Sequence, residues 1–107
     1  MSDQHTLISK AFQTFMTKAP AHAQAWAEAI QGLGKASALD PKTGALAYLA
    51  VLAVQRLESG IPFHVRAARQ AGASRDEVIS AILIGLPLGG NVVTRVLPAA
   101  IAAYDAE

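Results

Sequence analysis

The feature that most constrains the fold is the stretch Ala45–Val54, which contains no charged residue and is apolar on every side when wound as a helix. Asp40-Pro41 marks where this helix begins, because Asp accepts hydrogen bonds from free amides and Pro fits the first helical position. We predict a helix over residues 41–57, ended by Ser59-Gly60. A helix that is apolar all round must be central to a fold. The apolar run Ala45–Val54 is far shorter than the ~20 residues that a membrane span needs.

The rest of the chain also has helical spacing, and period-2 alternation bounded by turn dipeptides is absent. Helices are predicted over 4–17, 20–33, 62–72 and 75–86, and a last one from Asn91 onward. Gly32 and Gly34 are expected to end the second of these helices, and Pro62 lies in the first turn of the helix that ends at Gly72. Pro98 is expected to kink or divide the last helix. A capping box, Ser74-Arg-Asp-Glu77, opens the fifth helix. The sequence therefore predicts one all-α domain over residues 1–107, a compact bundle of about six helices.

The composition predicts self-association. Hydrophobic residues make up 52% of the chain and charged residues 16%, against usual values of about 45–50% and about 25%. A domain this small has much surface for its volume. We therefore expect a protein-covered apolar surface, in a homo-oligomer.

Several classes of function are disfavoured by residue content. There is no cysteine, so disulfides, thiolate catalysis and cysteine-ligated metals are excluded. The net charge is +1 with no basic cluster, which is not the pattern of a nucleic-acid-binding protein. His5, His22 and His64 share no ligand spacing, so no metal or other cofactor is expected. Residues 1–6 are polar, unlike a signal peptide, and we expect a cytoplasmic protein without a membrane span.

Three segments in a fixed order resemble one family. They are Leu39-Asp-Pro-Lys-Thr followed by the apolar helix, Ile61-Pro-Phe-His-Val-Arg-Ala-Ala68, and Gln70-Ala-Gly-Ala-Ser-Arg-Asp-Glu-Val-Ile79. Together they are similar to the carboxymuconolactone decarboxylase family, which includes the alkylhydroperoxidase D-like proteins. The resemblance is strongest over residues 39–90. It implies an all-α fold that assembles with copies of itself, as a homotrimer or homohexamer.

The resemblance also implies what this chain lacks. The peroxidase branch carries a Cys-x-x-Cys-x-x-x-His motif with a supporting Glu in the preceding helix. His64 fills the His position, whereas Leu57 and Gly60 stand at the Cys positions and Ala45 at the Glu position. Without a thiolate no nucleophile can attack a peroxide. The chain is therefore not expected to work as a thiol peroxidase.

Five residues are candidates for a site. His64 is the candidate acid or base, since an imidazole exchanges protons near neutral pH, and Glu58 is its candidate partner. Tyr48 is the one polar-tipped residue in the apolar helix, where a buried hydroxyl needs a hydrogen-bond partner. Asn91 follows Gly89-Gly90 at a predicted helix start that would present free amides to an anion, and Arg95 would add a charge for a carboxylate.

Two interpretations stay open from the sequence. In the first, the chain is an enzyme that uses His64 for acid–base chemistry of the decarboxylase, lyase or isomerase type on a small organic acid or lactone. In the second, the active site has decayed and the oligomer serves as a binding or scaffold protein. Each of the five residues also has a structural interpretation, for example an inert core histidine or a solvated helix end.

Overall fold

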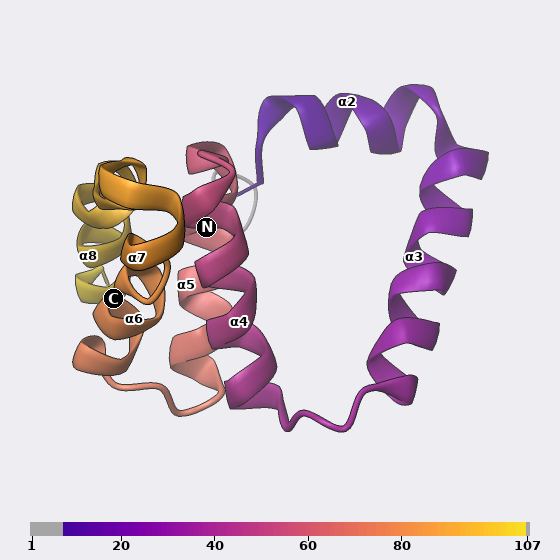
Figure 1. The fold of residues 1–107 in the computed structure, drawn as a ribbon. Helices are drawn as coiled ribbons and strands as arrows, with labels where there is room; N and C mark the ends of the chain where they lie inside the picture. Colours follow the sequence, from indigo (N-terminus) through magenta and orange to yellow (C-terminus); the bar gives the residue numbers. More distant parts are fainter. Residues whose placement is uncertain (1–7, 107) are drawn as a thin grey trace.

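The structure is a computed structural model that describes residues 8–106, and every regular element in that range is helical (Figure 1). The elements are α2 (Lys10–Lys18), α3 (Pro20–Ala36), α4 (Pro41–Val54), the 3-10 helix η1 (Glu58–Gly60), α5 (Ile61–Gln70), α6 (Arg75–Leu83), α7 (Leu86–Gly89), the 3-10 helix η2 (Gly90–Val96) and α8 (Leu97–Asp105). The predicted all-α fold is confirmed. Residues 4–7 of the predicted first helix lie outside the described residues.

Side-chain caps begin three of the helices. Ser9 Oγ accepts a hydrogen bond from the amide of Phe12 at 3.1 Å, and Asp40 Oδ1 accepts one from the amide of Thr43 at 2.8 Å. At α6 the predicted capping box is present, with Ser74 Oγ and Glu77 Oε1 each accepting from the other residue's amide. These bonds satisfy amides that a helix start leaves free.

The core lies entirely within the bundle of α4 to α8. The buried apolar residues run from Leu49 to Ala100, and the largest fully buried side chains are Leu49, Ile61, Val65, Val78, Ile82, Val93 and Val96. Helix α4 packs on α5, α6 and η2, which bears out its predicted central position. One of its faces nevertheless stays exposed, with Val51 54% accessible.

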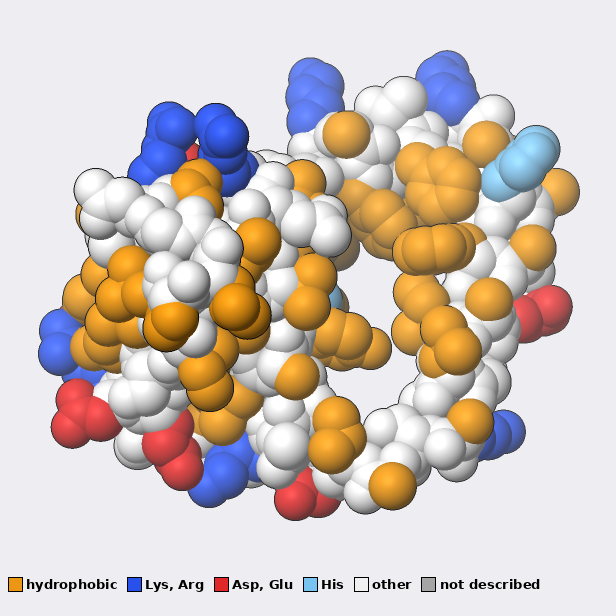
Figure 2. Space-filling model, viewed as in Figure 1, with side chains coloured by type: hydrophobic (Ala, Val, Ile, Leu, Met, Phe, Trp, Pro, Cys, Tyr) orange, Lys and Arg blue, Asp and Glu red, His pale blue; other side chains and the backbone are white. Residues whose placement is uncertain are grey.

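Helices α2 and α3 form an arm that stands away from this bundle. The arm leaves the top of the bundle in Figure 1, turns, and brings α3 down opposite α4 before the chain enters α4. Neither α2 nor α3 contains a buried residue, and the main packing partner of each is the other. In the space-filling view an opening separates α3 from α4, and apolar side chains line it (Figure 2).

The C-terminal third is a closed hairpin. By length and composition alone the 31-residue stretch Arg75–Asp105 could cross a membrane, because an 18-residue window within it has a mean hydropathy of 1.6. Its two ends meet, however, because Arg75 Nε lies 3.0 Å from Asp105 Oδ1, and α6 packs on α8. A stretch whose ends touch cannot be one spanning rod, and its residues Val78, Ile82, Val93, Val96 and Ala100 are buried in the bundle core.

Several predicted helix boundaries are wrong. Helix α3 continues through Gly32 and Gly34 to Ala36, because an interior glycine weakens a helix by only about 1 kcal/mol. Helix α4 ends at Val54, since Arg56 adopts a φ of 59° that no α-helix continues. Helix α6 ends at Leu83 instead of near residue 86.

The last predicted helix also differs from the structure. Asn91 does not cap it; Asn91 lies inside η2, and its carbonyl accepts a hydrogen bond from Thr94 Oγ1 at 2.8 Å. Pro98 divides the segment, because it occupies the first turn of α8, where a missing amide hydrogen is tolerated.

Candidate functional site

His64 lies in the second turn of α5 and packs between aromatic rings. Its ring centroid is 5.6 Å from that of Tyr48 on α4 and 5.2 Å from that of Phe63, both in edge-on geometry. The His64 side chain is half-buried. The α4–α5 contact that builds the core therefore also brings Tyr48, a predicted site residue, against the His64 ring.

Burial lowers the pKa of His64 from its usual value near 6.5, because a desolvated imidazole is harder to charge. No side chain among residues 8–106 donates a hydrogen bond to the His64 ring or forms an ion pair with it. The ring is consequently neutral near pH 7. In the described chain its nitrogens remain available to a ligand, to water or to a neighbouring subunit.

Glu58 and Arg95 lie beside each other, and among residues 8–106 neither forms a hydrogen bond or an ion pair with His64. Arg95 Nε is 3.8 Å from Glu58 Oε2, with both side chains about half exposed. An exposed pair at this separation contributes little to stability. The structure thus brings two predicted site residues together as partners of each other, with no interaction between Glu58 and His64 among the described residues.

Tyr48 departs from its expected environment. The sequence predicts a buried hydroxyl in need of a partner, but 56% of Tyr48 is exposed. Its position on α4 places it on the uncovered face of that helix, where water can satisfy the hydroxyl. Tyr48 therefore touches His64 through its ring, and its hydroxyl has no hydrogen-bond partner in the described part of the chain.

Gly60, which stands where the resemblance implies a cysteine, lies beside His64. A Cβ atom added to Gly60 would lie 3.8 Å from His64 Cδ2, at ordinary contact distance. Ala45 on α4 packs against the core, and Leu57 is exposed where the chain leaves α4. None of these three residues has a reactive side chain.

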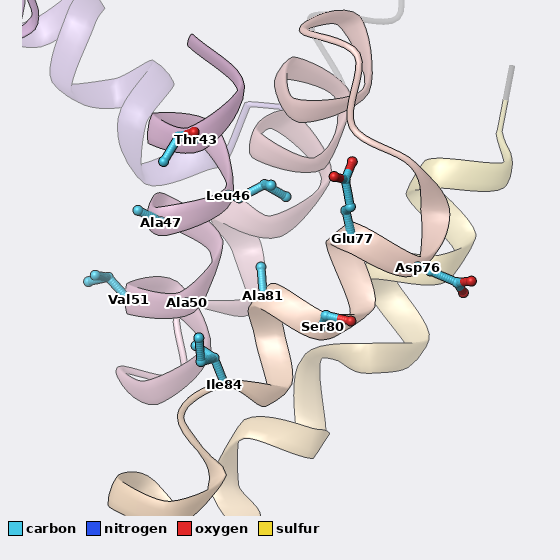
Figure 3. A pocket seen from close by; sticks show the side chains of 10 residues that line it. All are labelled: Thr43, Leu46, Ala47, Ala50, Val51, Asp76, Glu77, Ser80, Ala81 and Ile84. Atoms are coloured by element: carbon cyan, nitrogen blue, oxygen red, sulfur yellow. The ribbon is translucent and has the colours of Figure 1, made fainter. Parts of the chain in front are cut away.

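A separate groove of about 710 Å³ lies between α4 and α6 (Figure 3). It is shallow and mainly apolar. Its lining residues are Thr43, Leu46, Ala47, Ala50, Val51, Asp76, Glu77, Ser80, Ala81 and Ile84. In Figure 3 the carboxylates of Asp76 and Glu77 point away from the groove floor. The groove includes none of the five predicted site residues, and sequence reasoning missed it because it exists only where two helix surfaces meet.

The groove offers little for catalysis. Glu77 is already engaged, with its carboxylate bonded to the Ser74 amide and to Lys42 Nζ at 3.0 Å. These bonds hold the pKa of Glu77 below its ordinary value, the Ser74 amide contributing most. No group of three or more metal-ligating side chains occurs among residues 8–106. Among the described residues, His64 is the side chain best suited to proton transfer near neutral pH.

Comparison with known proteins gives one result on the family level. The family model described as the carboxymuconolactone decarboxylase family matches residues 20–102, which is most of the chain and includes α3 to η2 and most of α8. No curated protein and no solved structure matches the chain.

Proposed function

The chain belongs to the carboxymuconolactone decarboxylase family, and on that premise we propose that it is a cysteine-free, homo-oligomeric member that transfers protons through His64. The substrate is a small organic acid or lactone. The observation that carries this proposal is the setting of His64: half-buried, flanked by Tyr48 and Phe63, and with no hydrogen-bond partner on its ring nitrogens in residues 8–106.

A neutral imidazole in an apolar setting is suited to act as a base. It accepts a proton from an acidic C–H beside a carbonyl and returns it to another atom of the same substrate. The aromatic rings beside His64 exclude water from part of the imidazole, and a substrate with an apolar body fits against them. The lowered pKa keeps His64 in its basic form through the physiological range.

Arg95 is the proposed carboxylate anchor. Among residues 8–106 its guanidinium forms only the long, exposed ion pair with Glu58, so an incoming carboxylate can replace Glu58 at small cost. In this proposal Glu58 keeps Arg95 oriented when no substrate is bound. Asn91, whose side chain is exposed near the start of η2, lies on the same segment as Arg95 and would contact the same carboxylate.

Thiol peroxidase activity is not part of this proposal. The family's cysteine positions are Leu57 and Gly60, and the 107 residues contain no thiol. Dithiol-dependent reduction of an alkyl hydroperoxide by the pure protein is therefore expected to equal the rate without protein.

One observation favours a second candidate function, that of a catalytically decayed scaffold. No polar side chain converges on His64 in the described chain, and the groove between α4 and α6 lies elsewhere. An enzyme site ordinarily brings several polar groups around its base. The two candidates differ in whether a neighbouring subunit or a substrate supplies those groups.

Hydrogen exchange at carbon separates the two candidates, whatever product the reaction forms. Small carboxylic acids and lactones are incubated with protein in D2O, and proton NMR follows the loss of C–H signals next to the carbonyl. We expect catalysed exchange for at least one compound with the wild type, and loss of that exchange in His64→Gln, because Gln keeps a donor and an acceptor but does not titrate. No exchange above the protein-free rate in the wild type supports the scaffold function, whereas equal catalysed exchange in both proteins would show that His64 is not the base.

A further inference from the structure

The arm carries an apolar stripe that no other element among residues 8–106 buries. On α3 the stripe consists of Ala23, Trp26, Ile30 and Leu33, which share one face of the helix at spacings of three and four residues. Trp26 is 53% exposed and Leu33 70% exposed. The opposite face carries the polar residues Gln24, Glu28, Gln31 and Lys35. We call the apolar set the α3 stripe.

Helix α4 presents a matching surface across the opening. Its exposed face contains Ala47, Tyr48 and Val51, and no charged residue occurs between Lys42 and Arg56. We call these three residues the α4 stripe. Apolar side chains of both helices are visible around the opening in Figure 2. Both stripes are uncharged, so each suits the other, and neither offers a charge to a polar partner.

The chain exposes more surface than a compact monomer of its mass, and the excess is large enough to form an interface. The chain has an accessible surface of 7112 Å². A compact monomer of 11.1 kDa is expected to expose about 5,700 Å², so the excess is about 1,400 Å². Each partner of a standard stable interface contributes about 800 Å². The radius of gyration, 14.2 Å, likewise exceeds the roughly 13 Å expected for a compact domain of this length.

We propose that the α3 stripe packs on the α4 stripe of a second copy of this chain, reciprocally, so that two copies clasp one another by their arms. A second copy is the occupant because one chain carries both halves of the contact, which is the condition for a self-complementary two-fold interface. The arm is held to its own bundle by few contacts, so it is free to make this one.

The packing of each α3 stripe on the other copy has a consequence for the candidate site. Tyr48 belongs to the α4 stripe and is in edge-on contact with the His64 ring. The partner's arm would therefore lie over the Tyr48–His64 pair and close its exposed side. This inference deepens the oligomeric part of the proposed function. It does not depend on proton transfer by His64.

The absence of cysteine makes the test clean, since introduced thiols are the only ones present. The double variant Ala23→Cys/Ala47→Cys places one thiol on each stripe. Mild oxidation is followed by denaturing, non-reducing electrophoresis. We expect a covalent dimer as the main product. Each single variant is run alongside to account for disulfides between identical positions.

Ala21→Cys/Ala47→Cys is the matched control, because Ala21 lies on the opposite face of α3. It should give several-fold less covalent dimer. A disulfide confined to single chains would overturn the proposal, since the arm would then cover its own α4. So would an oligomer that forms without this cross-link, or a chain that remains monomeric and leaves the stripes to another protein.

A failed proton-transfer hypothesis leaves a different trace. The same cross-linking pair is built into His64→Gln. Intact cross-linking there, with no proton exchange by the wild type, would remove the enzymatic function and keep the arm exchange. Proton exchange without cross-linking would keep the enzymatic function and remove the proposed contact between the arms of two copies.

Discussion

At the scale of single residues, His64 is distinguished by its neighbours, because two aromatic rings pack edge-on against its imidazole. Leu57, Gly60 and Ala45 occupy the places where the family resemblance implies reactive groups. In the structure Gly60 lies beside His64 and Ala45 packs against the core. What remains around the imidazole is aromatic. The chemistry of His64 is therefore set by desolvation, and no charged neighbour tunes it.

His64 should make stability depend on pH. Its pKa is lower in the folded chain than in the unfolded chain, so the unfolded state binds more protons as pH falls below about 6.5. The contribution is fully present above that pH and is lost as pH falls through the folded pKa. Urea unfolding followed by circular dichroism at pH 7.5 and pH 5 should show a smaller decrease in unfolding free energy for His64→Gln than for the wild type.

His22→Gln is the control for that measurement, because His22 is exposed on α3 and lies outside the core. An identical pH dependence in wild type and His64→Gln would contradict the assigned role of burial. Any activity that uses His64 as a base should also decline only below about pH 6.5, on the acid side of the reference imidazole pKa.

Gly85 is required for close packing between α4 and the α6–α7 connection. A Cβ atom there would meet Val54 Cγ2 at 2.9 Å, and the branched side chain of Val54 has little freedom to move away. Gly85→Ala should lower the unfolding free energy by about 1–3 kcal/mol. Gly44→Ala, where no atom lies within 4 Å of the added Cβ, should instead raise it by about 0.5–1 kcal/mol.

Chemical denaturation of both glycine variants checks this pair. Equal effects of the two substitutions would show that packing at Val54 does not limit residue 85. The double variant Gly85→Ala/Val54→Ala removes the clashing methyl groups, so it should lose less stability than the sum of its two single variants.

At the scale of elements, α4 and α5 end in the same motif with different residues. At the end of α4 the Leu57 amide bonds the Leu52 carbonyl and the Arg56 amide bonds the Ala53 carbonyl. At the end of α5 the amides of residues 73 and 72 do the same to the carbonyls of residues 68 and 69. This Schellman motif needs one residue in the left-handed region. Gly72 supplies it with φ 101°, and Arg56 supplies it with φ 59°.

The two ends should respond oppositely to substitution. Arg56→Gly should raise the unfolding free energy by roughly 1 kcal/mol, because a side chain is disfavoured in the left-handed region. Gly72→Ala should lower it by a similar amount for the same reason. Thermal unfolding of both variants measures the effect. Destabilisation by Arg56→Gly would mean that the Arg56 side chain makes a contact worth more than this strain.

At the scale of the whole molecule, core and exposed apolar surface are separated along the chain. Among residues 8–106 the buried apolar residues all lie between Leu49 and Ala100, whereas α2 and α3 contribute none. A bundle that already has its core does not require the arm for its own packing. The apolar residues of the arm are therefore best explained by contact with another copy.

The assembled state should be an integral multiple of the 11.1 kDa chain, and salt should not dissociate it. The contacting stripes are uncharged, so screening removes little of their attraction. Light scattering at micromolar concentration should give the same oligomeric mass at about 0.05 M and about 0.5 M NaCl, because salt weakens only exposed charge–charge contacts. A monomer mass in either buffer would contradict the assembly, and dissociation at high salt would show that ion pairs hold it.

The sequence by itself determined the fold class and most helix starts. An uncharged run flanked by Asp40-Pro41 can form only a core helix, and Ser74 and Glu77 define a helix start by local hydrogen bonds. Such signals act over a few residues, so they can be recognised in the sequence. The absence of thiols and the position of His64 in the family pattern also follow from the sequence alone.

Tertiary structure decided what the candidate residues touch. In the structure Glu58 pairs with Arg95, and the exposed Tyr48 packs its ring edge-on against His64. Helix α3 continues past Gly32 and Gly34 and forms part of the arm. Each outcome depends on how distant helices pack, and that packing is a sum of many weak contacts with no local signature. The sequence predicted apolar excess, but only the fold showed where it lies: on the face of α4 beside His64 and on the arm opposite.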